Sequence, residues 1–138
     1  RTVRDDGLLV VNDAYNANPE SMAAALRAVA GLDRSRRVAV LGEMLELGES
    51  AERAHRDIGV LARELGYDRV VVVGDGAGAI AEGAGDVAVQ VPDVDVAVTT
   101  LSAWLSAEDV VLVKASRGCR LERVADALVA TTGGTHSP

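Results

Sequence analysis

The sequence predicts an α/β fold in three layers: a mostly parallel sheet with helices on both of its faces. Short apolar runs such as RVVVVG (69–74) alternate along the chain with segments of helical periodicity. The runs are rich in valine and stay apolar at successive positions, which is typical of parallel strands buried on both faces. The 138 residues suit one domain, so we expect a single domain over residues 1–138.

Apolar runs mark the expected strands, and the stretches between them have the spacing of amphipathic helices. The expected strands are residues 8–11, 37–42, 69–74, 87–91 and 110–115. The expected helices cover residues 19–31 and 51–65, a short stretch through residue 80, and residues 94–105 and 121–128. The run at 87–91 is the weakest of the strand signals, which favours a place at the edge of the sheet.

Polar residues at the expected helix ends support these boundaries. Asn18 is expected to cap the first long helix, with Pro19 in its first turn, where a missing N–H costs nothing. Ser50 and Asp93 are expected to cap two later helices through their side chains. Gly66 is expected to end the helix that begins after Ser50, because glycine adopts the left-handed conformation common at that position.

Composition and charge exclude several functional classes. The net charge of −7 argues against a nucleic-acid partner, since phosphate backbones require clustered lysine and arginine. One cysteine allows no disulfide within the chain, which suits a reducing cytoplasm. No apolar stretch approaches the roughly 20 residues of a membrane helix.

The sequence begins RTVRDDG, without an initiator methionine or a signal peptide, so we expect a fragment of a longer protein. Residues 131–138 are expected to form a flexible tail.

Ligands of open parallel sheets bind beyond the carboxyl ends of the strands, which directs attention to the loops there. The loop NDAYNANP contains an aspartate, Asp13, that can accept both hydroxyls of a ribose, and asparagines suited to an amide or an amino acid. A turn followed by a helix cap is an equally good interpretation. The loop KASRGC places Lys114, Ser116 and Arg117 where they can bind a carboxylate or phosphates, which we favour over an exposed basic turn.

Two further loops carry weaker signals. Glu43, Glu46 and Glu49 in GEMLELGES could hold Mg²⁺ or an ammonium group, although a solvated acidic loop is the better interpretation. His55, in the helix that follows, fits a boundary residue better than a catalytic one.

The loop GDGAGA satisfies a loose dinucleotide fingerprint, but it follows an internal strand rather than the first, so we do not expect NAD. The chain contains no P-loop sequence, and Cys119 fits a packing role better than that of a nucleophile.

The loops with their flanking strands resemble the C-terminal domain of Mur ligases. The resemblance is carried by VVNDAYNANPESMAAAL, VAVLGEMLELGESAERAHRDIG, VVVVGDGAGAIAEGA and VVLVKASRGCRLERV, in that order, from about Val10 to Val129. NDAYNANPESM and GEMLELG are its most specific pieces. The segment VKASR supports it, although this chain has Ala115 where the family pattern has glycine.

The resemblance implies a Rossmann-like αβα domain, the last of three in an enzyme whose N-terminal and central ATPase domains are absent from this sequence. It is strongest to members that add D-Ala-D-Ala to UDP-N-acetylmuramoyl-tripeptide in peptidoglycan synthesis. In that reaction ATP activates the peptide carboxylate as an acyl phosphate, and the dipeptide amine displaces phosphate. ATP and Mg²⁺ are then bound mainly by the central domain. We expect a cytoplasmic, monomeric enzyme, and a fragment that is inactive alone.

The family pattern also implies roles for individual residues. Asp13, Tyr15 and Asn16 would contact ATP, with Asp13 on the ribose hydroxyls. The residues implied for binding of D-Ala-D-Ala are Asn16, Asn18, Lys114, Ser116 and Arg117. Glu43, Glu46 and His55 belong to a recognisable motif and are possible loop contacts. The resemblance assigns no catalytic residue and no metal ligand to this domain.

Two alternatives stay open on the sequence. The chain could be a stand-alone Rossmann-like module that binds a nucleotide without catalysis. It could also be the closing domain of a sister Mur ligase that adds a single amino acid. The reading frame upstream distinguishes the first alternative, and acceptor specificity distinguishes the second.

Overall fold

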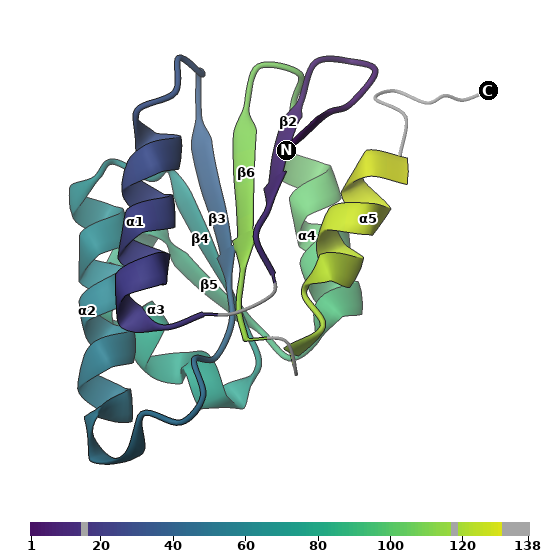
Figure 1. Ribbon diagram of the computed structural model, residues 1–138. Helices are drawn as coiled ribbons and strands as arrows, with labels where there is room; N and C mark the ends of the chain where they lie inside the picture. The colour runs from purple at the N-terminus through teal and green to yellow at the C-terminus, as the bar shows by residue number, and fades with distance from the viewer. Residues whose placement is uncertain (15–16, 117–118, 131–138) are drawn as a thin grey trace.

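The computed structural model describes residues 1–14, 17–116 and 119–130, and its centre is a six-stranded sheet in the order β1-β2-β6-β3-β4-β5 (Figure 1). The strands are β1 (Thr2–Val3), β2 (Leu9–Asn12), β3 (Arg37–Leu41), β4 (Arg69–Val73), β5 (Ala88–Val91) and β6 (Val110–Lys114). From β2 to β5 all neighbours are parallel, which confirms the mostly parallel sheet. The weak strand β5 lies at one edge, as predicted. The antiparallel strand β1 was not predicted, because two residues show no periodicity.

Helices cover both faces of this sheet. They are α1 (Pro19–Ala30), α2 (Ala51–Glu64), α3 (Gly78–Ala84), α4 (Val94–Trp104) and α5 (Glu122–Ala130), with short 3-10 turns at η1 (Gly48–Ser50), η2 (Asp75–Ala77) and η3 (Gly85–Val87). Figure 1 shows α1, α2 and α3 on one face and α4 and α5 on the other. The predicted three-layer αβα architecture is therefore confirmed.

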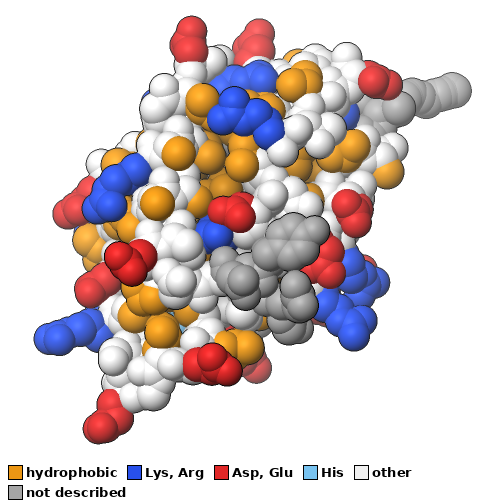
Figure 2. All heavy atoms as spheres, in the orientation of Figure 1, with side chains coloured by type: hydrophobic (Ala, Val, Ile, Leu, Met, Phe, Trp, Pro, Cys, Tyr) orange, Lys and Arg blue, Asp and Glu red, His pale blue; other side chains and the backbone are white. Residues whose placement is uncertain are grey.

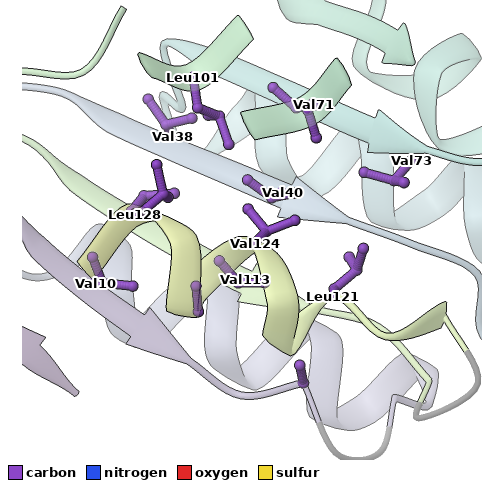
Figure 3. Close-up of a cluster of buried hydrophobic side chains, with 14 of the residues drawn as sticks. Val10, Val38, Val40, Val71, Val73, Leu101, Val113, Leu121, Val124 and Leu128 are labelled. Atoms are coloured by element: carbon purple, nitrogen blue, oxygen red, sulfur yellow. The ribbon is translucent and has the colours of Figure 1, made fainter. Parts of the chain in front are cut away.

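The core consists of two layers of aliphatic side chains, one on each face of the sheet. Successive strand residues point to opposite faces, so Val38 and Val40 pack toward α4 and α5 while Ala39 and Leu41 pack toward α1, α2 and α3. Figure 3 shows the first layer, in which Val38, Val40 and Val71 lie near Leu101 of α4. Both faces of each central strand are buried, which explains why these strands are apolar without alternation.

Three of the four predicted helix ends have the expected geometry. The Asn18 side chain accepts a hydrogen bond from the Ser21 N–H (2.8 Å), and Asp93 accepts one from Val96 (2.9 Å). Gly66 has φ +84°, the conformation expected after the end of α2. The prediction for Ser50 is wrong: its side chain makes no capping bond. Ser50 has helical φ and ψ because the 3-10 turn η1 runs directly into α2, and a side-chain cap requires an extended residue there.

Charged side chains are spread over the surface. Figure 2 shows acidic side chains distributed around the face in view, in keeping with 21 acidic against 14 basic residues in the chain. Among the described residues, no helix is long and apolar enough to cross a membrane.

Candidate functional site

The strand order brings three of the predicted loops to one edge of the sheet. Strand β6 lies between β2 and β3, so the loops that follow these three strands meet at their carboxyl ends (Figure 1). Backbone hydrogen bonds continue past the strands: Asp13 N–H donates to the Val113 carbonyl (2.9 Å), and Gly42 N–H to the Lys114 carbonyl (3.1 Å). The loops are therefore held in register by the sheet itself. This is the edge where ligands of open parallel sheets bind.

Asp13 and Lys114 form an ion pair across this edge. The Lys114 Nζ lies 2.7 Å from the Asp13 Oδ2 and 3.4 Å from the Asp13 backbone oxygen. The Lys114 side chain is 2% exposed and that of Asp13 is 48% exposed. Two residues that were assigned to different ligands thus contact each other, and the carboxylate is the partner that faces solvent.

The first loop leads into α1 through a double cap. Asn18 Oδ1 accepts from the Ser21 N–H, and the Ser21 hydroxyl lies 3.1 Å from the Asn18 N–H. These bonds confirm the structural role predicted for Asn18; its contact with substrate stays a prediction. Tyr15, Asn16 and Arg117, which were assigned to ATP or to the dipeptide, lie outside the described residues.

His55 holds the second loop in place. It is 3% exposed, and its Nε2 lies 2.8 Å from the Met44 backbone nitrogen, which donates to it. The other ring nitrogen, Nδ1, lies 2.6 Å from the Ala51 carbonyl oxygen. Because Nε2 accepts from the Met44 N–H, Nδ1 is assigned as the donor to the Ala51 carbonyl. His55 is thus a satisfied buried residue that fixes the loop, in line with the interpretation preferred from the sequence.

The glutamates of this loop differ in their surroundings. The Glu43 carboxylate lies against Gly76, so closely that a Cβ at residue 76 would overlap it. The Glu43 backbone oxygen accepts a hydrogen bond from the Ser116 N–H (3.1 Å), which joins this loop to the one after β6. Glu46 is exposed and has φ +63°. Only Glu43 of these two contacts the neighbouring loops.

Ser116 and Cys119 lie beside this junction. Ser116 is 7% exposed, and its Oγ lies 3.4 Å from the Cys119 Sγ. The Cys119 Sγ lies 3.8 Å from the Glu43 carbonyl oxygen, as a weak donor. The thiol therefore packs at the junction of the two loops. This agrees with the structural interpretation of Cys119.

A hollow of about 430 Å³ opens beyond β4 and β5, next to these loops. Glu43 and Cys119 border it on the side of the predicted site. Its other charged lining residues, not predicted as site residues, are Asp75, Asp93, Asp95, Arg120 and Arg123. Carboxylates and guanidinium groups share one hollow, so it offers partners for both ends of a zwitterion. Asp93 was recognised only as a cap, and Arg120 and Arg123 lie in the motif VVLVKASRGCRLERV without a role assigned to them.

A second hollow, of about 490 Å³, lies on the other side of Glu43 and is lined in part by His55, Glu52 and Glu82. Arg56 neutralises the last two, at 2.6 Å from Glu52 and 3.0 Å from Glu82. Asp75 and Gly76 of the GDGAGA loop line both hollows, and Gly74 of the same loop has φ +93°. That loop leads through the turn η2 into the seven-residue helix α3.

Comparison with known proteins identifies the family. The family model described as "Mur ligase, glutamate ligase domain" matches residues 1–117. The chain belongs to this family of Mur ligase domains. The resemblance inferred from the loop motifs is thereby confirmed, and the matched range contains all the candidate site residues.

Curated relatives show which kind of Mur ligase this domain is similar to. It is 48% identical to the UDP-N-acetylmuramoyl-tripeptide–D-alanyl-D-alanine ligase of Mycobacterium tuberculosis, over 94% of this chain and 30% of that protein. It is 36% identical to the ligase of the same name from Bacillus subtilis, over 91% of this chain and 29% of that protein. The chain therefore spans about 30% of the length of the relatives that it matches.

Solved structures give the same result. The MurF ligase of Thermotoga maritima, in complex with ADP, matches with a TM-score of 0.81 and 31% identity, over 92% of this chain and 29% of that one. A MurF structure from Acinetobacter baumannii matches with a TM-score of 0.84 and 30% identity, over 94% of this chain and 30% of that one. The fold of this domain is thus that of one part of a longer ligase.

Proposed function

We propose that this chain is the site-closing C-terminal domain of an ATP-dependent ligase that joins D-Ala-D-Ala to UDP-N-acetylmuramoyl-tripeptide in peptidoglycan synthesis. One observation carries the proposal: a curated ligase of that name is 48% identical over 94% of this chain. The order of the loop motifs supports it, as does a structural relative described in complex with ADP.

The half-exposed carboxylate of Asp13 supports the nucleotide role. It lies at the carboxyl end of β2 and presents oxygen atoms to solvent, as needed to accept hydrogen bonds from the two ribose hydroxyls of ATP. We assign Tyr15 and Asn16, from the same loop, to the nucleotide as well. Each assignment concerns binding, and none makes a residue of this domain a catalytic one.

We assign the incoming dipeptide to the loop after β6 and the hollow beside it. Lys114, Ser116 and Arg117 would bind the dipeptide carboxylate, and Asn16 and Asn18 would contact the dipeptide as well. The mixed charges of the 430 Å³ hollow support this placement, because free D-Ala-D-Ala carries both an ammonium and a carboxylate group. We assign Glu43, at the border, to the ammonium end and Glu46 to a contact from the same loop, which His55 holds through Met44.

The domain would act by closing over the reacting groups. The terminal carboxylate of the tripeptide takes the γ-phosphoryl group of ATP and becomes an acyl phosphate. The dipeptide amine then attacks the acyl carbon, and phosphate leaves as the amide forms. Closure of this domain would exclude water from the acyl phosphate and orient the amine. Both effects require that ATP and the dipeptide are held at one edge of the sheet.

The residues that the structure describes offer no cluster of metal ligands for Mg²⁺. Within the described parts of the chain, no group of three or more His, Cys, Asp or Glu side chains could hold a metal ion. We therefore propose that the Mg²⁺ accompanying ATP binds to the part of the enzyme outside this chain. We further propose a monomeric enzyme of the cytoplasm, where ATP and its UDP-linked substrate occur.

The test is phosphate release from ATP by the protein encoded by the complete reading frame. Release that requires both the UDP-linked tripeptide and D-Ala-D-Ala would establish the reaction. Release with a single amino acid and its own precursor would assign the chain to a sister Mur ligase. No release with any acceptor, together with ATP binding, would favour the stand-alone nucleotide module instead.

A further inference from the structure

Lys114 is unusual among the candidate site residues because it is a buried cation. It ends β6, the strand between β2 and β3, and its side chain is 2% exposed. A buried ammonium group is tolerated only when partners replace its lost hydration. Its Nζ donates to Asp13 Oδ2 at 2.7 Å and lies 3.4 Å from the Asp13 carbonyl oxygen. The buried member of this pair therefore contacts Asp13 through both its carboxylate and its backbone oxygen.

Asp13 is fixed at both its backbone and its side chain. Its N–H donates to the Val113 carbonyl (2.9 Å), which extends the pairing of β2 with β6 by one residue. Its Oδ2 receives the Lys114 ammonium, whereas Oδ1 accepts no hydrogen bond from any described residue. One carboxylate oxygen is therefore held from inside the protein, and the other is left toward solvent.

A carboxylate that accepts two ribose hydroxyls must hold one orientation. A free aspartate at a strand end rotates about its side-chain torsions and loses that freedom only on binding, which weakens the affinity. A buried ammonium contact fixes these torsions before the ligand arrives. The Lys114 side chain is 2% exposed and that of Asp13 is 48% exposed, so the carboxylate is the member of the pair that solvent and a ligand reach more easily.

We propose that Lys114 is a positioning residue for Asp13: its buried ammonium orients the carboxylate that binds the nucleotide ribose, and it does not itself bind the dipeptide carboxylate. The inference rests on the proposed function and revises one residue of it. Lys114 thereby moves from the acceptor side of the site to the nucleotide side. Ser116 and Arg117 keep their assignment to the dipeptide.

Steady-state kinetics of the full-length enzyme provide the test, with Lys114→Met, Asp13→Asn and the double variant. We expect each single substitution to raise the KM for ATP about tenfold, as expected when one hydrogen bond to a charged group is lost. The KM for D-Ala-D-Ala should stay unchanged. The double variant should show about the same increase as either single variant, because both remove one oriented carboxylate.

Arg36→Met is the matched control. Arg36 pairs with the buried Asp109 at 2.8 Å, next to the start of the same strands β3 and β6 and at the opposite edge of the sheet. This substitution removes an ion pair that also has one buried member, here the carboxylate, at a place away from the site. It should lower the melting temperature and leave both KM values unchanged.

Melting temperatures provide a second, independent readout. Loss of the Asp13 charge removes a carboxylate that compensates a buried ammonium group, whereas loss of the ammonium leaves a carboxylate that water can still hydrate. Asp13→Asn should therefore lower the melting temperature more than Lys114→Met does. Adding Lys114→Met to Asp13→Asn should restore part of the lost melting temperature.

The outcomes separate this inference from the proposed function. A rise in the D-Ala-D-Ala KM for Lys114→Met, without a change for ATP, would overturn the inference and return Lys114 to the dipeptide. The inference would also be overturned if the increases in the KM for ATP multiplied in the double variant. Equal decreases in melting temperature for the two single variants would overturn it as well. If the wild-type enzyme releases no phosphate with any acceptor, the proposed function itself fails, and the inference fails with it.

Discussion

At the scale of single residues, His55 connects a helix to a loop of the candidate site. Its Nε2 is the acceptor for the N–H of Met44, and Met44 is 1% exposed. We expect His55→Ala to lower the free energy of unfolding by about 1–3 kcal/mol, the cost of an unsatisfied buried donor. Urea denaturation of the chain measures it. Thr99→Ala, which removes an exposed bond to the Asp95 carbonyl, is the control and should change little.

Tyr67 makes a second buried connection of this kind. Its hydroxyl donates to the Leu26 carbonyl oxygen of α1 at 2.8 Å, and burial raises the pKa of the phenol well above its usual value. We expect Tyr67→Phe to cost about 1 kcal/mol, because the ring still packs and only the hydrogen bond is lost. An unchanged denaturation midpoint would show that water replaces the hydroxyl as donor to Leu26.

At the scale of elements, two glycines allow α2 and α3 to approach closely. A Cβ at Gly59 would overlap the Ile80 carbonyl oxygen, and one at Gly83 would overlap the Arg56 carbonyl oxygen. Since the clashes involve backbone atoms, the helices would have to separate. We expect Gly83→Ala to lower the free energy of unfolding by about 2–3 kcal/mol.

Gly31→Ala is the matched control for this substitution. Gly31 follows α1 with φ −82°, and the nearest atom to an added Cβ is the Ala28 oxygen at 3.6 Å. Alanine should be accepted there with little change or a small gain in stability. Equal effects of the two alanines on the urea midpoint would contradict the close packing of α2 on α3.

An ion pair beside the first strand, β1, stabilises the fold to an extent that depends on pH. The Arg4 guanidinium lies 2.8 Å from Asp6 and also donates to the Leu128 carbonyl, and its bond to Asp6 lowers the pKa of that carboxyl to about 2. A lowered pKa stabilises the fold above the unfolded value, and this contribution is lost as pH falls toward 2.

We therefore expect Asp6→Asn to lower the free energy of unfolding by up to about 2 kcal/mol at pH 7. The difference from wild type should shrink between pH 4 and pH 2, where the wild-type carboxylate is protonated as well. Urea titrations at a series of pH values measure it. Asp57→Asn, at an exposed residue with no ion pair among the described residues, should show no such trend. A difference that persists at pH 2 would rule out the linkage.

At the scale of the whole molecule, the edge of the sheet must serve two ligands at once if the domain closes a ligase. Arg117→Ala in the full-length enzyme should raise the KM for D-Ala-D-Ala about tenfold or more, the loss expected for a charge-assisted contact. The KM for ATP should change little. Equal effects on the two KM values would indicate that closure as a whole is impaired.

Local patterns in the sequence determined the elements of this protein and their order. Unbroken apolar runs predict buried parallel strands, and Asn18, Asp93 and Gly66 mark helix ends through bonds or conformations that span only a few residues. Such signals are readable because their partners are neighbours in the chain. Ser50 shows where such local signals fail: it is the last residue of the turn η1, which gives it a helical conformation, and no pattern in the sequence predicted that turn.

Only the tertiary structure decided which residues of the site meet. Asp13 and Lys114 are 101 residues apart, and they pair because β6 inserts between β2 and β3. The junction of Glu43 with Ser116 and the hollow with Arg120 and Arg123 depend on the same strand order. Strand order follows from how two aliphatic core layers are filled on opposite faces of one sheet, which is a property of the whole chain. The sequence by itself therefore determined the loops that carry the site, and packing decided how their side chains are combined.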